Sequence, residues 1–142
     1  MNTTARKNLA PALPPFAPGQ VNALADELIY DTAMGGTIYA GERNPIHGYV
    51  VGGVKTARWD SRYDALNEHG TEGLRNKLIQ MSALAQSPRA TLGYWIDDDD
   101  LSLWIDLGTW VPSYDEAMDL GARRGEKAVY SITDDKVLPV RA

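Results

Sequence analysis

The chain has 142 residues, of which 44% are hydrophobic and 23% charged; it contains no cysteine and carries a net charge of −5. This length suits one ordinary domain with its own core. The lack of cysteine excludes disulfide scaffolds, thiol catalysis and iron–sulfur clusters. Acidic side chains outnumber basic ones, whereas non-specific nucleic-acid binding depends on clustered Lys and Arg, so we expect no direct contact with DNA or RNA.

The sequence gives no sign of membrane insertion or secretion. No apolar run is long enough to cross a bilayer. Arg6 and Lys7 lie near the N-terminus, but the apolar segment of a secretory signal does not follow them. We therefore expect a cytoplasmic protein with no membrane partner.

Residues 1–19 form the first segment, and they are rich in proline, which cannot continue a helix or a central strand. We expect a Pro-rich arm that is ordered only if it packs on the domain or on a partner. The remaining residues, 20–142, are predicted to form a single domain.

The next two predicted elements are a short helix and a strand pair. Residues 20–32 have apolar positions at helical spacing, and Gly35-Gly36 ends that pattern. Residues 37–40 and 48–54 are predicted to pair as strands through the loop 41–47. Gly52 and Gly53 indicate a bulge or a close approach in the second strand.

Residues 56–86 have a helical character, with a predicted break at Gly70. In this interpretation Arg58 and Arg62 are four residues apart on one helix face. They could meet a phosphate or a partner's carboxylate. Asp60 and Asp64 alternate with them, so an exposed, salt-bridged face is the alternative.

The C-terminal third has the strongest pattern of the chain. Apolar residues alternate before and after the run Asp97–Asp100, which predicts a β-hairpin with an acidic tip. Ser113 and Glu116 have the spacing of a helix-capping box, and Gly125 is suited to follow the end of that helix. Residues 127–133 and 136–140 are predicted to form a final hairpin. Pro139 lacks an N–H group, so the last strand should lie at a sheet edge.

Hairpins interrupted by helices are typical of the α+β class. The sequence therefore predicts an antiparallel sheet of about six strands, built from hairpins, with helices packed on it.

The tryptophans are the best candidates for a binding surface. Trp95 and Trp104 have the parity opposite to the Leu and Ile face of their hairpin, so they could pair across the strands on a second face. An exposed aromatic face is typical of a partner, ligand or homodimer surface. The alternative is a sheet covered on both faces, with both rings in the core. Trp110 is included in the same candidate surface.

The acidic run and the two histidines are candidates for chemistry. Asp98 and Asp99 could contact a basic partner, but the run lacks the ligand pattern of an EF-hand, and a solvated turn is the plain alternative. Asp106, Asp134 and Asp135 would extend this acidic patch if the hairpin tips lie at one end of the sheet. His47 and His69 have no nucleophile or carboxylate at motif spacing. We expect no metal, no cofactor and no catalytic residue.

The helix start Tyr114-Asp115-Glu116-Ala117 and the exit Arg124-Gly125-Glu126-Lys127-Ala128-Val129-Tyr130 carry a resemblance. This unit resembles a module in small uncharacterised accessory proteins of actinobacteria and their phages. The resemblance covers the last third of the chain. It implies a phage or mobile-element accessory protein, and it supplies no active site.

Three functions follow as hypotheses. The first is a non-enzymatic binding protein, a small phage or mobile-element accessory factor that docks on a host protein, with counter-defence as one such role. The second is a binder of a small nucleotide-like ligand, with tryptophan stacking and arginines on phosphates. The third is a small enzyme that uses His47 or the cluster Asp97–Asp100. If the protein is such a binding protein, we also expect it to form a homodimer through the tryptophan face.

Overall fold

The computed structural model describes residues 15–31 and 33–141, so the predicted arm falls outside it as far as residue 14. The elements follow in the order α2 (Pro18–Tyr30), β1 (Gly35–Tyr39), a short 3₁₀ turn η1 (Ala40–Glu42), β2 (Tyr49–Trp59), α3 (Arg62–Ala83), β3 (Ala90–Ile96), β4 (Leu103–Val111), α4 (Tyr114–Arg123), β5 (Ala128–Ser131) and β6 (Lys136–Pro139). This is the predicted α+β class. In the described residues no helix is long and apolar enough to cross a membrane.

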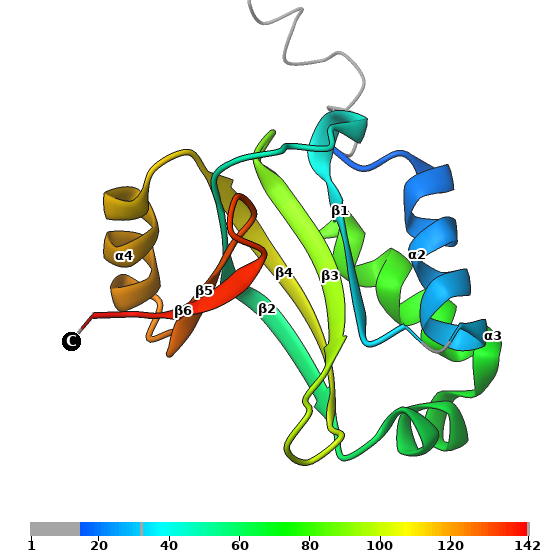
Figure 1. Cartoon of the computed structure of the whole chain (residues 1–142). Helices are drawn as coiled ribbons and strands as arrows, with labels where there is room; N and C mark the ends of the chain where they lie inside the picture. Colours follow the sequence, from blue (N-terminus) through cyan, green and yellow to red (C-terminus); the bar gives the residue numbers. More distant parts are fainter. Residues whose placement is uncertain (1–14, 32, 142) are drawn as a thin grey trace, which may run out of the picture.

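The six strands form one antiparallel, curled sheet in the order β1-β3-β4-β2-β5-β6 (Figure 1). The predicted hairpins β3–β4 and β5–β6 are confirmed, and β6 lies at an edge as Pro139 required. The predicted pairing of residues 37–40 with 48–54 is wrong. β1 pairs with β3, and β2 lies between β4 and β5.

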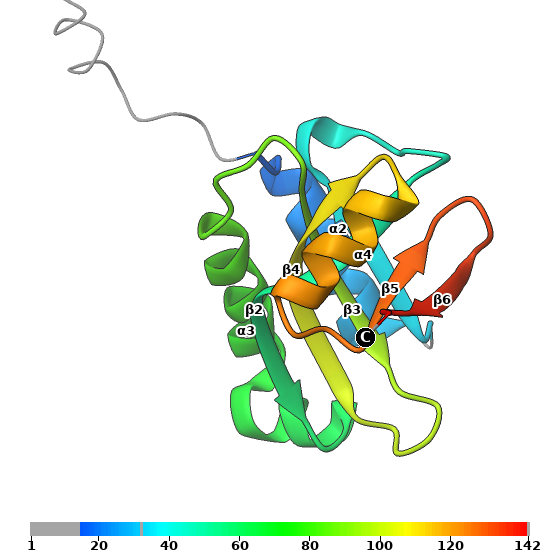
Figure 2. The same cartoon turned by 90° about the vertical axis from the view of Figure 1, so that its left-hand side faces the viewer.

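The helices all lie on one face of this sheet. Leu103, Ile105 and Leu107 pack in the cluster beneath α2 and α3, and Val111, at the same parity of β4, packs with α4. Because the sheet is strongly curled, α2 and α3 cover one part of this convex face, beside β3 and β4, and α4 covers another part, beside β2 and β5 (Figures 1 and 2). In the part of the chain that the structure describes, the opposite, concave face carries no helix.

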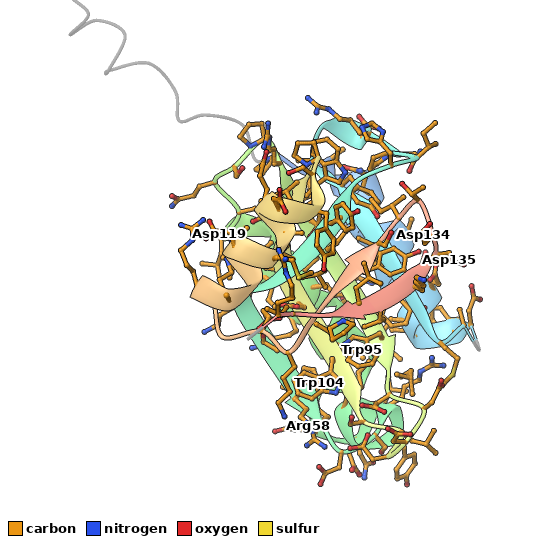
Figure 3. All side chains as sticks on the ribbon, turned by 60° about the vertical axis from the view of Figure 1, so that its left-hand side comes forward. Arg58, Trp95, Trp104, Asp119, Asp134 and Asp135 are labelled. Atoms are coloured by element: carbon orange, nitrogen blue, oxygen red, sulfur yellow. The ribbon has the colours of Figure 1, made fainter. Side chains whose placement is uncertain are left out.

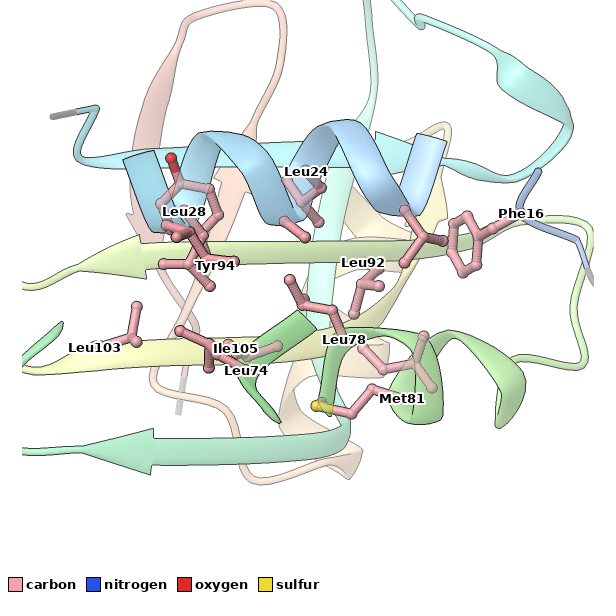
Figure 4. Packing of buried hydrophobic residues seen from close by; sticks show 14 of the residues in the cluster. Phe16, Leu24, Leu28, Leu74, Leu78, Met81, Leu92, Tyr94, Leu103 and Ile105 are labelled. Atoms are coloured by element: carbon pink, nitrogen blue, oxygen red, sulfur yellow. The ribbon is translucent and has the colours of Figure 1, made fainter. Parts of the chain in front are cut away.

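Two clusters of buried residues hold these layers. The larger joins α2 and α3 to β3 and β4, and its close packing is visible in Figure 4. It includes Leu74, Leu78 and Met81, the stripe typical of a buried helix face, and Phe16, which is 3% exposed. The smaller cluster lies under α4 and consists of Val51, Val111, Ala117, Met118 and Val129. Buried apolar area of this kind contributes about 25 cal/mol per Å².

The helix boundaries follow from local signals. Pro18 occupies the first turn of α2, where its missing N–H costs nothing, and Gln20 Oε1 accepts a hydrogen bond from Ala17 N at 2.9 Å. α2 thus begins two residues before the predicted start. In α3, Gly70 has a φ of +72°, which breaks the helix as expected. Ser113 Oγ accepts a hydrogen bond from Glu116 N at 3.1 Å and begins α4.

The interpretation of residues 56–61 as helix is wrong, because β2 continues to Trp59. A bulge explains the extra length. The β2–β4 register shifts between Val51 and Lys55, and Gly53 has a φ of +96° that favours glycine. The strand resumes its pairing beyond the bulge, where Arg58 lies opposite Trp104. The bulge itself was predicted from the glycines.

Candidate binding groove

The concave face of the sheet forms a groove with a cavity volume of about 590 Å³. Its lining comes from β1, β3, β4 and β2 and continues onto β5 and β6. Side chains alternate along a strand, so the residues between the core positions point into this groove. The two edge strands, β1 and β6, therefore border the same hollow.

The floor of the groove is built from glycines on four strands, which are Gly35, Gly52, Gly93 and Gly108. At two of these positions a side chain would collide with the backbone of a neighbouring strand. A Cβ at Gly108 would lie 2.5 Å from the backbone oxygen of Val51, and one at Gly93 would lie 2.9 Å from that of Gly36. The missing side chains let the neighbouring strands approach closely at these points and keep side chains off the floor of the groove.

Aromatic rings stand at the sides of the groove. Tyr39 comes from β1, Tyr130 from β5 and Trp95 from β3. The Tyr130 hydroxyl donates a hydrogen bond to Asp135 Oδ1 at 2.5 Å. This bond is the main cause that raises the pKa of Tyr130 to about 12, and it fixes the direction of the hydroxyl group.

Two carboxyl groups meet at the bulge in β2. Asp106, on β4, accepts hydrogen bonds from Gly53 N at 3.1 Å and from Thr56 Oγ1 at 3.0 Å. Glu126 reaches the same point from the link between α4 and β5, because a Cβ at Gly52 would lie 1.8 Å from Asp106 Oδ2 and 3.0 Å from Glu126 Oε1. Burial raises the pKa of both groups, and the charge of Asp106 raises that of Glu126 further.

Arg124 anchors the other side of the bulge. Its guanidinium donates hydrogen bonds to the backbone oxygens of Val51 and Gly52, at 3.0 and 3.1 Å, and to Thr109 Oγ1 at 2.9 Å. Thr109 has the parity of the core face of β4. The Arg124 guanidinium therefore donates its hydrogen bonds to atoms of the sheet and not to the carboxylates of Asp106 and Glu126.

The predicted pairing of Trp95 with Trp104 is confirmed. They are register partners, and their rings stack with centroids 6.1 Å apart. Figure 3 shows both on the concave face beside Arg58, whose guanidinium lies 5.5 Å from the centroid of the Trp104 ring. The alternative of a core position is wrong for Trp95, which is 46% exposed.

The predicted arginine pair is separated by the structure. Arg58 lies in β2 and forms ion pairs with Asp60 at 2.8 Å and Asp100 at 3.4 Å. Arg62 begins α3 and donates to the backbone oxygens of Asp31 and Ala33, beyond the end of α2. They do not share a helix face, because a strand and a turn separate them.

The acidic tip is a structured turn. Asp97 Oδ1 accepts from Asp99 N at 2.8 Å, while Asp98 and Asp99 are exposed. Asp134 and Asp135 lie well away from Arg58, the partner of Asp100, in Figure 3. The condition for one continuous acidic patch is therefore not met. Among residues 15–31 and 33–141, no group of three His, Asp or Glu side chains could hold a metal ion.

Trp110 lies apart from the other two tryptophans, in a smaller cleft of about 370 Å³ that also contains His47 and Arg89. Its indole Nε1 donates to the backbone oxygen of His47 at 2.9 Å, and the two rings meet edge to face. The lining of this cleft includes no carboxylate. His69 lies on α3, outside both the groove and the cleft, with its Nε2 atom 3.4 Å from Glu68 Oε2.

The site predicted from the sequence thus contained Trp95 and missed Tyr39, Tyr130 and Glu126. A signal for part of the groove was present: Gly93, Asp106 and Gly108 occupy the parity opposite to the Leu and Ile positions. Tyr39 and Tyr130 gave no comparable signal, because their strands meet only in the folded sheet. No protein-family model, curated protein or solved structure matches this chain.

Proposed function

We propose that this protein is a non-enzymatic binding protein that receives part of a host protein in the concave groove. The observation that carries the proposal is the groove itself, which has a floor of glycines, aromatic walls and no helix of residues 15–31 or 33–141 above it. Concave sites with aromatic walls and a few fixed polar groups are typical of binding sites. In this proposal the protein acts in the cytoplasm as a phage or mobile-element accessory factor.

A small nucleotide-like ligand is the second candidate, because Tyr39, Tyr130 and Trp95 offer rings on which a base could stack. The described lining, however, contains no Lys, Arg or His to meet a phosphate. Arg58, Arg62 and Arg124 are engaged in contacts within the chain. The protein partner is therefore the better supported occupant. A catalytic role for His47 has less support, since the cleft around it supplies no carboxylate to orient the ring.

Capture from a lysate of the native host tests this proposal. Ala128 lines the groove from β5, and Ala128→Trp would fill it, whereas the exposed Ala122 on α4 offers a matched control, Ala122→Trp. We expect mass spectrometry to find a host protein bound to the wild type and to Ala122→Trp but not to Ala128→Trp. A nucleotide lost with Ala128→Trp would favour the second candidate, and equal capture by all three chains would contradict the groove proposal.

A further inference from the structure

The groove has a one-sided charge. As far as the structure describes the chain, its lining includes three carboxyl groups, those of Asp106, Glu126 and Asp135, and no basic side chain. None of the three forms an ion pair with a Lys, Arg or His among residues 15–31 and 33–141. Elsewhere on the described surface, seven ion pairs join carboxylates to arginines, so the groove differs from the rest of the molecule.

We infer that the groove receives an extended segment of the partner that carries an arginine or lysine, with the cationic group at Asp106 and Glu126. This inference rests on the proposed function and adds the chemistry of the partner. Charge complementarity carries it, since carboxylates that form no internal ion pair would repel an acidic segment and attract a basic one.

The position of the two carboxylates suits a single cationic head group. Asp106 Oδ2 and Glu126 Oε1 both lie within 3.0 Å of the position that a Cβ of Gly52 would take. A guanidinium can bind carboxylates through several N–H donors, and an ammonium has three. Because Gly52 has no side chain, the Asp106 carboxylate can lie against its backbone, with the Glu126 carboxylate beside it. Both residues line the groove from which the cation would approach. Asp106 is held in place by its bonds to Gly53 and Thr56.

The rest of the groove suits the stem and the backbone of such a segment. Long basic side chains bury their methylene groups on apolar surface, and the rings of Tyr39 and Tyr130 are available for this. The four glycines place no side chain on the floor of the groove, so a main chain could lie close to the sheet. β1 and β6 are edge strands on either side of the groove, so an extended segment could also pair with β1. β6 is less suitable, because Pro139 cannot donate.

The test uses three capped pentapeptides, which differ only at the central residue: arginine, its neutral isostere citrulline, or glutamate. Threonine and valine flank that residue to favour an extended chain. Binding to the full chain is followed by NMR through the indole N–H signals of Trp95 and Trp104. We expect the arginine peptide to bind about tenfold more tightly than the citrulline peptide, and the glutamate peptide to bind more weakly still. The preference should fall with added salt.

Two isosteric variants locate the site. Glu126→Gln removes one groove charge, whereas Glu116→Gln makes the same change on α4, outside the groove. We expect Glu126→Gln to reduce the preference for arginine over citrulline by about fivefold and Glu116→Gln to leave it unchanged. Circular dichroism verifies that both variants are folded.

The outcomes separate this inference from the proposed function. Equal binding of the arginine and citrulline peptides, or an equal effect of the two variants, would overturn the inference. If a host protein is nevertheless lost with Ala128→Trp, the groove is a docking site for a segment of other chemistry. If no host protein depends on the groove but the arginine peptide binds as expected, the proposed function fails and the cation site stands.

Discussion

Trp95 and Trp104 face each other across the β3–β4 ladder, with their ring planes 26° from parallel. Arg58 of β2 continues the row, so three neighbouring strands contribute to one stack on the face that carries no helix. This stack lies at the end of the groove that Trp95 lines. Because it does not belong to either buried cluster, its residues can be changed without opening the core.

The first prediction concerns Trp104→Glu. We expect the variant to remain folded, with a loss of about 1–2 kcal/mol in the free energy of unfolding from the lost stacking and cation–π contacts. If the predicted homodimer forms through this face, the new charge should also lower the assembled mass. Light scattering and chemical denaturation measure the two effects. A variant that fails to fold would show that Trp104 acts as a core residue.

The second prediction concerns the start of α4. Ser113→Ala removes the side-chain acceptor of the Glu116 N–H, and we expect the free energy of unfolding to fall by about 1 kcal/mol. Urea denaturation of the variant and of Thr133→Ala, an exposed control in the β5–β6 turn, makes the comparison. An unchanged midpoint for Ser113→Ala would contradict the assigned cap.

The third prediction compares two glycines. Gly108→Ala would bring a methyl group to 2.5 Å from the Val51 backbone oxygen, so we expect a loss of about 1–3 kcal/mol as the strands move apart. At Gly19, in the first turn of α2, nothing lies within 4 Å of the added methyl group. Gly19→Ala should be neutral or stabilise by up to about 1 kcal/mol. Thermal unfolding of both variants tests this opposite behaviour.

The fourth prediction is a pH dependence of stability. Burial raises the pKa of Asp106 in the folded chain above its unfolded value. The folded state therefore favours the protonated form, and the contribution of Asp106 to stability is present in acid and lost as the pH rises through the folded pKa. Asp106→Asn keeps an oxygen that can accept from Gly53 and Thr56 but carries no charge.

We expect Asp106→Asn to be more stable than the wild type at neutral pH, with a difference that shrinks as the pH falls through the folded pKa of Asp106 towards the unfolded pKa of aspartate. The pKa of Glu126 should fall in the same variant, because the neighbouring charge is gone. Urea denaturation across this pH range and NMR titration of Glu126 measure the two effects. Lower stability of the variant at neutral pH would show that the bonds to Asp106 outweigh its burial.

The fifth prediction concerns Asp98 and Asp99. Both are exposed at a turn that Asp97 already stabilises, so the double replacement by asparagine should leave folding unchanged and should not reduce Ca²⁺ binding. Calorimetry that finds a tight, stoichiometric Ca²⁺ site in the wild type, absent from the double variant, would refute this interpretation.

Sequence patterns predicted the elements better than their pairing. The β3–β4 and β5–β6 hairpins depend on turns within a few residues, and so does the cap at Ser113. The pairing of β1 with β3 joins residues separated by a whole helix, and no local signal specifies it. The prediction that Arg58 lies in a helix is wrong, because the helical pattern of residues 62–83 does not extend back to residue 58. Arg58 lies instead in β2, which continues past the bulge to Trp59.

The candidate site was harder to predict for the same reason. Trp95 and Trp104 could be paired from parity alone, since one short turn joins their strands. Glu126 and Asp106 meet only because the bulge at Gly52 and Gly53 brings the end of α4 to β4. A groove that depends on strand order follows from the sheet as a whole, and single segments of the sequence do not determine it.

The division of the buried residues into two clusters has a mechanical consequence. The floor of the groove rests on the large cluster, whereas the wall formed by β5 and β6 rests on the small cluster beneath α4. Val51 of β2 and Val111 of β4 belong to this small cluster, and they connect the β5–β6 wall and α4 to the centre of the sheet. Substitutions in the small cluster should therefore change the position of this wall, and with it the width of the groove, more than the stability of the floor.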